Sequence, residues 1–179
     1  MKRKVVFRVL IGLLLILFYN FFVIKNFYAW FDLAFQSSES LDLYFGFDKE
    51  QVISLIGSVD EKTRKFLAFG AVIDSFYALF YGIFYFYVLQ IMFRKLNYVD
   101  TPWVYFPLLL SFFDLLENAG IFMMIKQYPD IKDTFIKIFS FFNQMKWMMA
   151  ALTFLIFVFL LWKIFQVSFF SNRFEKSLH

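Results

Sequence analysis

The chain has 179 residues, of which 61% are hydrophobic and 25% aromatic, with a mean hydropathy of +0.65. This exceeds what a soluble core of that size requires. A soluble fold would leave much apolar surface, including many of the 31 Phe side chains, in water. The composition therefore excludes an ordinary soluble domain and predicts an integral membrane protein.

Missing residue types exclude several kinds of site. The chain has no Cys, which excludes disulfides, thiolate metal sites and thiol catalysis. Its one His is His179, so we expect no His-based metal or haem site. The net charge of +4 comes mainly from basic residues beside apolar segments, which suits membrane orientation better than nucleic-acid binding. We expect no cofactor, no metal and no nucleic-acid partner.

Four segments are apolar enough to span a membrane, which requires about 20 largely apolar residues. They are residues 5–30, 66–93, 103–125 and 138–162. The first could also be a signal peptide, but no small-x-small cleavage site follows it, so we interpret it as a retained helix. The sequence thus predicts one all-α membrane domain over residues 1–179, built as a bundle of four transmembrane helices.

Basic residues beside these segments predict the orientation, because such residues accumulate on the cytoplasmic side. They occur in the N-terminus (Lys2, Arg3, Lys4), the loop after the second segment (Arg94, Lys95) and the C-terminal tail (Arg173, Lys176). Both termini are then expected inside. The loop 31–65 is expected outside, and its seven acidic and four basic residues are consistent with that side.

The outer loop contains a short amphipathic segment at residues 48–56. Val52, Ile53 and Ile56 fall on one side of a helix with this sequence. We expect the helix to rest on the bundle or on the lipid surface, where it would act as a lid.

Capping and proline signals predict where the spanning helices begin and end. Ser58 with Glu61 matches a capping box, and Asp60 is an alternative cap, so the second helix should begin outside the membrane. Pro102 is expected in the first turn of the third helix. Pro129 follows the predicted end of that helix.

Four ionisable side chains lie inside the apolar segments: Asp74, Asp114, Glu117 and Lys146. Each costs about 2.5 to 3.5 kcal/mol in hydrocarbon on insertion scales, so those that persist usually face a partner or a cavity. Counted from the outer helix ends, Asp74, Glu117 and Lys146 all lie nine residues deep, or about 13 to 14 Å. The sequence therefore predicts a polar layer inside the membrane.

Further side chains are expected in this layer from their depth or their helix face. Asn20, Asn118, Asn143 and Tyr77 bring all four helices to it, and Trp147 lies too deep for an interfacial anchor. One lysine cannot neutralise three carboxylates in a low dielectric. We therefore expect at least one carboxyl group to be protonated at pH 7.

Three interpretations of the layer stay open. It can serve only to fix the helix register. It can bind a lipid or another lipophilic molecule. It can also carry chemistry, with Asp74 and Glu117 as acid and base while Lys146 and Asn118 stabilise developing charge. Proton-linked transport is disfavoured because four helices leave little room for alternating access, and a homo-oligomer would reopen it.

Two motifs carry a resemblance to a family. The strings DSFYALFYG (74–82) and FDLLENAG (113–120), followed by Tyr128-Pro129 and Lys146-Trp147, resemble a group of small bacterial four-helix integral membrane proteins with no established activity. The resemblance covers about residues 47–162. It implies the fold and a bacterial inner-membrane location, but no reaction. The matching positions are Asp74, Tyr77, Asp114, Glu117, Asn118 and Lys146.

A more distant resemblance is to the emopamil-binding sterol isomerase superfamily. Its small helical bundles place acidic and aromatic residues around a lipid-like ligand. This chain departs from that pattern because it has no intramembrane His. The resemblance implies a lipophilic ligand, with Glu117 and Asp74 as the groups that would move a proton.

Overall fold

The chain folds into helices in all the parts that the structure describes. A computed structural model describes residues 12, 14, 16–26, 41–98 and 101–176, and every regular element in these ranges is a helix. Three helical stretches are long and apolar enough to cross a membrane: α4 (Glu61–Lys95), the stretch Pro102–Gln127, and Asp133–Val167 within α6. The prediction of an all-helical membrane protein is confirmed at this level.

The outward faces of these helices carry large apolar side chains. On α6 (Asp133–Lys176), Phe154, Leu155 and Phe165 are 64%, 60% and 67% exposed. Apolar surface of this extent is unfavourable in water and is stable against lipid acyl chains. The exposed side chains therefore support the same membrane setting as the helix lengths.

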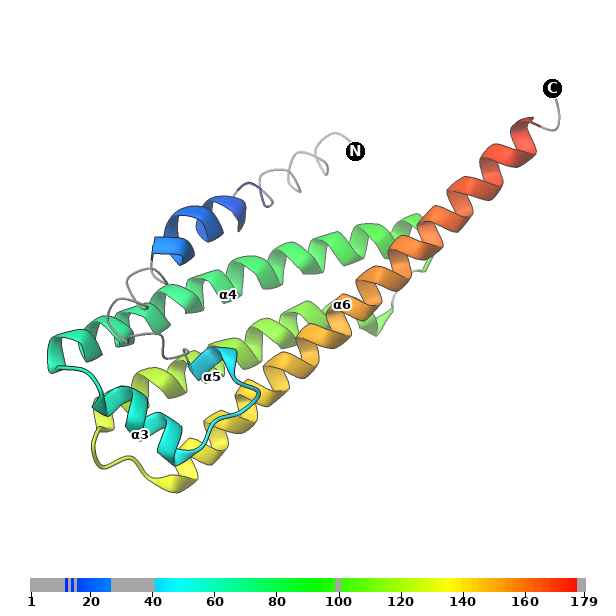
Figure 1. The fold of residues 1–179 in the computed structure, drawn as a ribbon. Coiled ribbons are helices and arrows are strands. Elements are labelled where there is room, and N and C mark those ends of the chain that lie inside the picture. Colours follow the sequence, from blue (N-terminus) through cyan, green and yellow to red (C-terminus); the bar gives the residue numbers. More distant parts are fainter. Residues whose placement is uncertain (1–11, 13, 15, 27–40, 99–100, 177–179) are drawn as a thin grey trace.

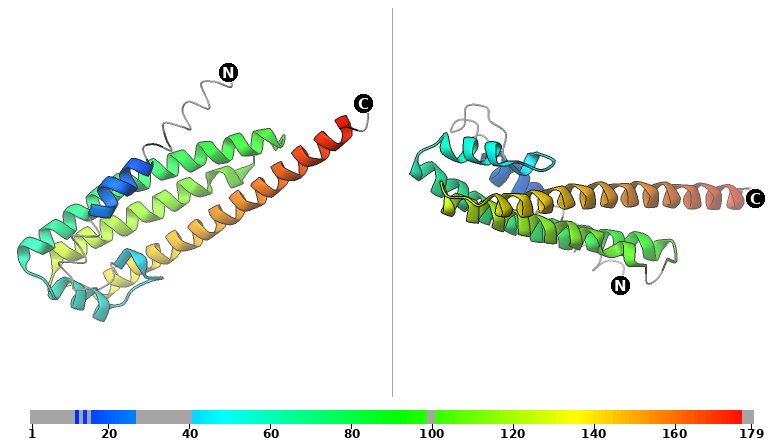
Figure 2. Two further views of the ribbon diagram at one scale, coloured as in Figure 1. Left: turned by 45° about the horizontal axis from the view of Figure 1, so that its top comes forward. Right: turned by 90° about the horizontal axis from the view of Figure 1, so that it is seen from below.

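The first predicted span, 5–30, is described only in part, and its basic N-terminal residues lie outside the described residues. Its described part is helical and includes the π-helix η1 (Tyr19–Ile24). This segment runs beside α4 (Figures 1 and 2), where the rings of Tyr19 and Tyr77 stack with centroids 4.9 Å apart. The Tyr19 hydroxyl donates to the carbonyl of Ile73 at 2.5 Å.

The helix α5 (Phe106–Gln127) packs against both α4 and α6, which contact each other much less (Figure 1). Two glycines allow the close approach. A Cβ atom at Gly82 of α4 would lie 2.5 Å from the Cβ of Ser111, and one at Gly120 of α5 would overlap the ring of Phe139. The backbones can therefore approach here only because these side chains are absent.

Two of the spanning helices, α4 and α6, are longer than predicted. The segment predicted at 66–93 is part of α4, whose 35 residues extend about 52 Å. The segment predicted at 138–162 is part of α6, whose 44 residues extend about 66 Å and project beyond the other helices (Figure 1). A hydrocarbon core is only about 30 Å thick. Hydropathy identified only the apolar parts of α4 and α6, because the turns that extend these helices contain polar residues.

The predicted amphipathic helix is present as α3 (Lys49–Gly57). Its start is a capping box: the Asp48 side chain accepts from the backbone N–H of Gln51, and the Gln51 side chain accepts from that of Asp48, both at 2.9 Å. Val52 and Ile56 are 0% and 1% exposed. They belong to a core cluster with residues from α4, α5 and α6, so α3 rests on the bundle.

The predicted capping box at Ser58 is wrong. Ser58 is the C-cap of α3, and its hydroxyl donates to the carbonyl of Leu55 at 2.8 Å. The alternative cap, Asp60, begins α4 and accepts from the backbone N–H of Thr63 at 2.9 Å. Hydrogen bonds from Thr63 also lower the pKa of the Asp60 carboxyl. Ser58 still has helical backbone angles (φ −70°, ψ −11°), whereas the residue that caps the start of a helix is extended, as Asp60 is (φ −72°, ψ 168°).

The proline signals of the third span are confirmed. Pro102 occupies the first turn of a 3-10 helix, η3 (Pro102–Tyr105), which leads directly into α5. The helix α5 then ends at Gln127, before Tyr128 and Pro129. Proline has no backbone N–H and so begins or follows helices more readily than it continues them.

We predict that Gly120→Ala lowers the melting temperature of the purified protein by several degrees. The added methyl group would overlap the Phe139 ring and push α5 from α6, at a cost of about 1 to 3 kcal/mol. The measurement is thermal unfolding in mild detergent. The neighbouring Ala119 is exposed, so Ala119→Leu is a control that should leave the transition in place.

Candidate functional site

An ion pair lies at the centre of the polar layer. The Nζ of Lys146 on α6 is 2.5 Å from the Oε2 of Glu117 on α5, and the two residues are 8% and 0% exposed. Asn143, one turn before Lys146, donates to the other Glu117 oxygen at 2.7 Å. Asn143 and Lys146 share a face because they are three residues apart on a helix. Both oxygens of the buried Glu117 carboxylate therefore have partners.

A second carboxylate approaches the same lysine. Asp114 lies three residues before Glu117, and its Oδ1 is 3.6 Å from the Lys146 Nζ. Its Oδ2 accepts a hydrogen bond from the hydroxyl of Tyr81 on α4 at 2.6 Å. Both Asp114 and Tyr81 are buried. The layer therefore links α4, α5 and α6 through side chains.

The third carboxylate lies on the side of the layer nearer the first helix. Asp74 on α4 accepts from the side-chain amide of Asn118 on α5 at 2.8 Å. Close by, Asn20 donates to the hydroxyl of Tyr77 at 2.8 Å. Asn20 also donates to the carbonyl of Ile16, inside the helix that carries the π-turn. Described parts of all four predicted spans thus contribute to the layer.

Trp147 takes a different position from the rest of the predicted set. Its side chain is 37% exposed, whereas that of its neighbour Lys146 points into the bundle. The Lys146 Nζ still lies 5.5 Å from the ring centroid, which is a cation–π distance. Trp147 therefore covers the lysine from outside rather than contributing a polar group to the layer.

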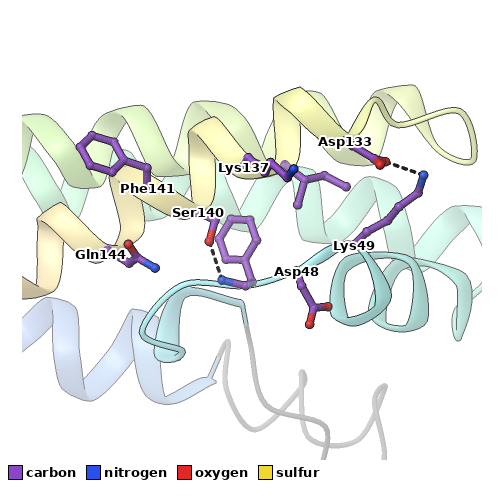
Figure 3. A pocket seen from close by; sticks show the side chains of 9 residues that line it. Asp48, Lys49, Asp133, Lys137, Ser140, Phe141 and Gln144 are labelled. Atoms are coloured by element: carbon purple, nitrogen blue, oxygen red, sulfur yellow. Dashed lines mark hydrogen bonds and ion pairs between the residues drawn. The ribbon is translucent and has the colours of Figure 1, made fainter.

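Residues 41–47 of the outer loop, which were not expected in the polar layer, also reach it. We refer to them as the outer segment. Lys146 Nζ donates to the backbone carbonyl of Asp42 at 3.2 Å, and the Gly46 N–H donates to Asn143 Oδ1 at 2.6 Å. The Phe47 N–H donates to Ser140 Oγ at 2.8 Å (Figure 3). The outer segment is therefore held on α6 by backbone groups.

A signal for this contact is present in α6. Ser140, Asn143 and Lys146 follow one another at intervals of three, so a polar stripe crosses an otherwise apolar helix face. A membrane helix gains nothing from such a stripe unless polar groups face it. Ser140 was absent from the predicted set because a lone serine is unremarkable in a transmembrane helix.

Acidic groups outnumber basic ones in the layer. Asp74, Asp114 and Glu117 share Lys146, and Asp42 also interacts electrostatically with Lys146 and with Asp114. An excess of buried negative charge is strongly unfavourable in a low dielectric. In the described part of the chain, no group of three His, Cys, Asp or Glu side chains could hold a metal ion in compensation.

The fold and the site together describe a helical integral membrane protein with a buried, hydrogen-bonded polar layer. No known family model, no curated protein and no solved structure matches the chain.

We predict that Gly46→Ala loosens the outer segment. Gly46 has a φ of +84°, where an L side chain costs about 1 kcal/mol or more, and its new Cβ would lie 2.5 Å from the Gln144 amide nitrogen. Hydrogen exchange of the Gly46 and Phe47 amides should become faster, while exchange within α5 stays slow.

A double variant separates the effect of the clash with Gln144 from the effect of the positive φ. Gln144→Ala removes the clashing side chain, so Gly46→Ala with Gln144→Ala should recover part of the protection from exchange. The protection that is still missing would then be due to the unfavourable backbone conformation at position 46. Gln144→Ala alone serves as the control. Unchanged exchange in Gly46→Ala would show that these backbone hydrogen bonds do not hold the outer segment.

Proposed function

We propose that the protein is a non-enzymatic, multi-pass membrane protein whose polar layer is structural. The observation that carries this proposal is the surroundings of the Lys146 ammonium, which has three N–H donors. Three protein oxygens lie around it: Glu117 Oε2 at 2.5 Å and Asp114 Oδ1 at 3.6 Å in ion pairs, and the Asp42 carbonyl at 3.2 Å in a hydrogen bond. The charge of the lysine is therefore compensated within the protein, as a structural role requires.

Asn143 supports the same proposal. Its amide nitrogen donates to Glu117 and its amide oxygen accepts from Gly46, so both polar ends are used within the protein. A buried ion pair with complete partners contributes little net stability, but it penalises every arrangement in which a partner is lost. The layer would thus fix the register of α5, α6 and the outer segment.

The proposal includes four crossings with both termini inside, as in the small bacterial inner-membrane proteins that the motifs resemble. The helical segment beside α4 supports the fourth crossing, since it is close enough for Tyr19 and Asn20 to contact α4. The protein would then act by binding lipids or a partner within the bilayer. Turnover of a substrate would not be required.

We predict that Lys146→Met strongly destabilises the protein, whereas Glu117→Gln with Lys146→Met recovers part of the loss. Removing only the cation leaves buried carboxylates without compensation, which costs about 3 to 5 kcal/mol for a buried pair. The double variant removes the pair and keeps an amide beside Asn143. The measurement is the melting temperature in mild detergent.

The control is Lys163→Met on the same helix, where the lysine lies over Phe159 and Trp162 and has no carboxylate partner among the described residues. Its melting temperature should be close to that of the parent protein. A Lys146→Met variant with an unchanged melting temperature would contradict a structural role for the layer.

The excess of carboxyl groups favours a second candidate, a membrane-embedded acid/base enzyme for a lipophilic substrate. Asp74 is the residue best placed for it, since it is only half-buried and accepts its hydrogen bond from the neutral amide of Asn118 rather than from a cation. A protonated Asp74 could donate to a bound lipophile, and Glu117 could accept a proton through the layer. This requires a carboxyl group that holds its proton at neutral pH.

We predict a carboxylic-acid C=O band in the infrared spectrum of the protein at pH 7. One lysine neutralises one carboxylate, so at least one of the other groups is expected to be protonated. The band should lose intensity in at least one of three variants: Asp74→Asn, Asp114→Asn or Glu117→Gln. If the spectrum has no such band, or if none of the three variants lowers its intensity, acid/base chemistry in this layer loses its basis.

A further inference from the structure

A groove of about 680 Å³ lies between the beginning of α4 and the end of α5, away from the polar layer. Apolar and aromatic side chains line its membrane side: Ala68, Phe69, Val72, Phe122 and Ile125. Charged side chains and a tyrosine line its other end: Glu61, Arg64, Lys65, Lys126 and Tyr128. One continuous groove thus joins a charged mouth to an apolar channel.

The charge at the mouth is positive. Lys65 pairs with Glu61 at 2.6 Å, so the acidic residue is already compensated. Arg64 and Lys126 take part in no salt bridge within the described ranges. Aromatic rings hold both in place: the Arg64 guanidinium carbon is 4.7 Å from the Tyr128 ring centroid, and the Lys126 Nζ is 4.5 Å from that of Phe122. Arg64 also interacts electrostatically with Asp60 and Glu61, but Arg64, Lys65 and Lys126 outnumber the one carboxylate that lines the groove, so the mouth keeps a net positive charge.

The positions of these basic residues in the sequence predict that the mouth lies at the level of the membrane phosphate groups. Arg64 and Lys65 directly precede the apolar run that begins at Phe66, and Lys126 directly follows the apolar run of α5. Basic side chains at helix ends extend toward the headgroup region while their aliphatic parts stay in the apolar region. We therefore expect water on one side of the mouth and acyl chains on the other.

We propose that this groove binds an anionic phospholipid. Its phosphate would lie between Arg64 and Lys126, where charge-assisted hydrogen bonds are available from both side chains. One acyl chain would extend along Phe69 and Val72 of α4 against Phe122 of α5. A free phosphate ion would use only the mouth, so the apolar channel below it favours a lipid.

The test is native mass spectrometry of the full-length protein in detergent with added phosphatidylglycerol or phosphatidylcholine of the same acyl chains. The parent protein should retain the anionic lipid in preference to the zwitterionic one. Arg64→Gln with Lys126→Gln should weaken that binding by roughly fivefold per cation, or about 25-fold in total. The control is the double variant Arg94→Gln with Lys95→Gln, which changes an exposed basic pair at the other end of α4. This variant should retain the binding of phosphatidylglycerol.

A second pair of variants tests the acyl channel independently of charge. Val72→Trp should fill the groove and remove phosphatidylglycerol binding, whereas Leu79→Trp, also exposed on α4, should not. Melting temperatures verify that each variant is folded. Equal retention of the two lipids by the parent protein, or equal loss in both double variants, would overturn the proposal. Displacement of the lipid by millimolar inorganic phosphate would do so as well, since it would assign the mouth to a free anion.

Discussion

The Lys146–Glu117 ion pair is the interaction on which the arrangement of the other polar groups depends. A charged side chain at this depth is tolerated only when protein groups replace its water. The residues around the pair provide that replacement. Asn143 completes the hydrogen bonding of Glu117, and Asp114 adds a second negative charge beside the lysine. The close packing of α5 on α6 then follows, because the side chains of the pair meet only when the two helices stay in one register.

The position of the outer segment follows from the same constraint. Lipid acyl chains offer no hydrogen-bond acceptor, so the Lys146 ammonium depends on protein acceptors, and the Asp42 carbonyl is one of them. Irregular backbone is tolerated at membrane depth only where protein covers its polar groups. Asn143 and Ser140 meet that condition by accepting from Gly46 and Phe47. The outer segment therefore packs as part of the helical bundle rather than as a separate lid.

The two proposed roles occupy different depths and use charge in opposite ways. In the polar layer the cation is enclosed by protein acceptors, which suits a structural part. At the groove mouth, Arg64 and Lys126 lie over aromatic rings and form no salt bridge among the described residues, which suits an anion from outside. The α4–α5 pair would thus carry both proposed roles, with the binding surface near the beginning of α4 and the structural contacts nearer its middle.

The sequence by itself determined the helical class, the apolar cores of three spans, the α3 helix and the depth of the charged residues, because hydropathy, periodicity and rise per residue are local properties. It predicted that Glu117 and Lys146 lie at one level, and the structure places them 2.5 Å apart. Only the tertiary structure decided which partners each side chain takes, such as Tyr81 for Asp114 and the Asp42 carbonyl for Lys146. Those pairs join residues 33 and 104 positions apart, and no local pattern encodes the chain folding that brings them together.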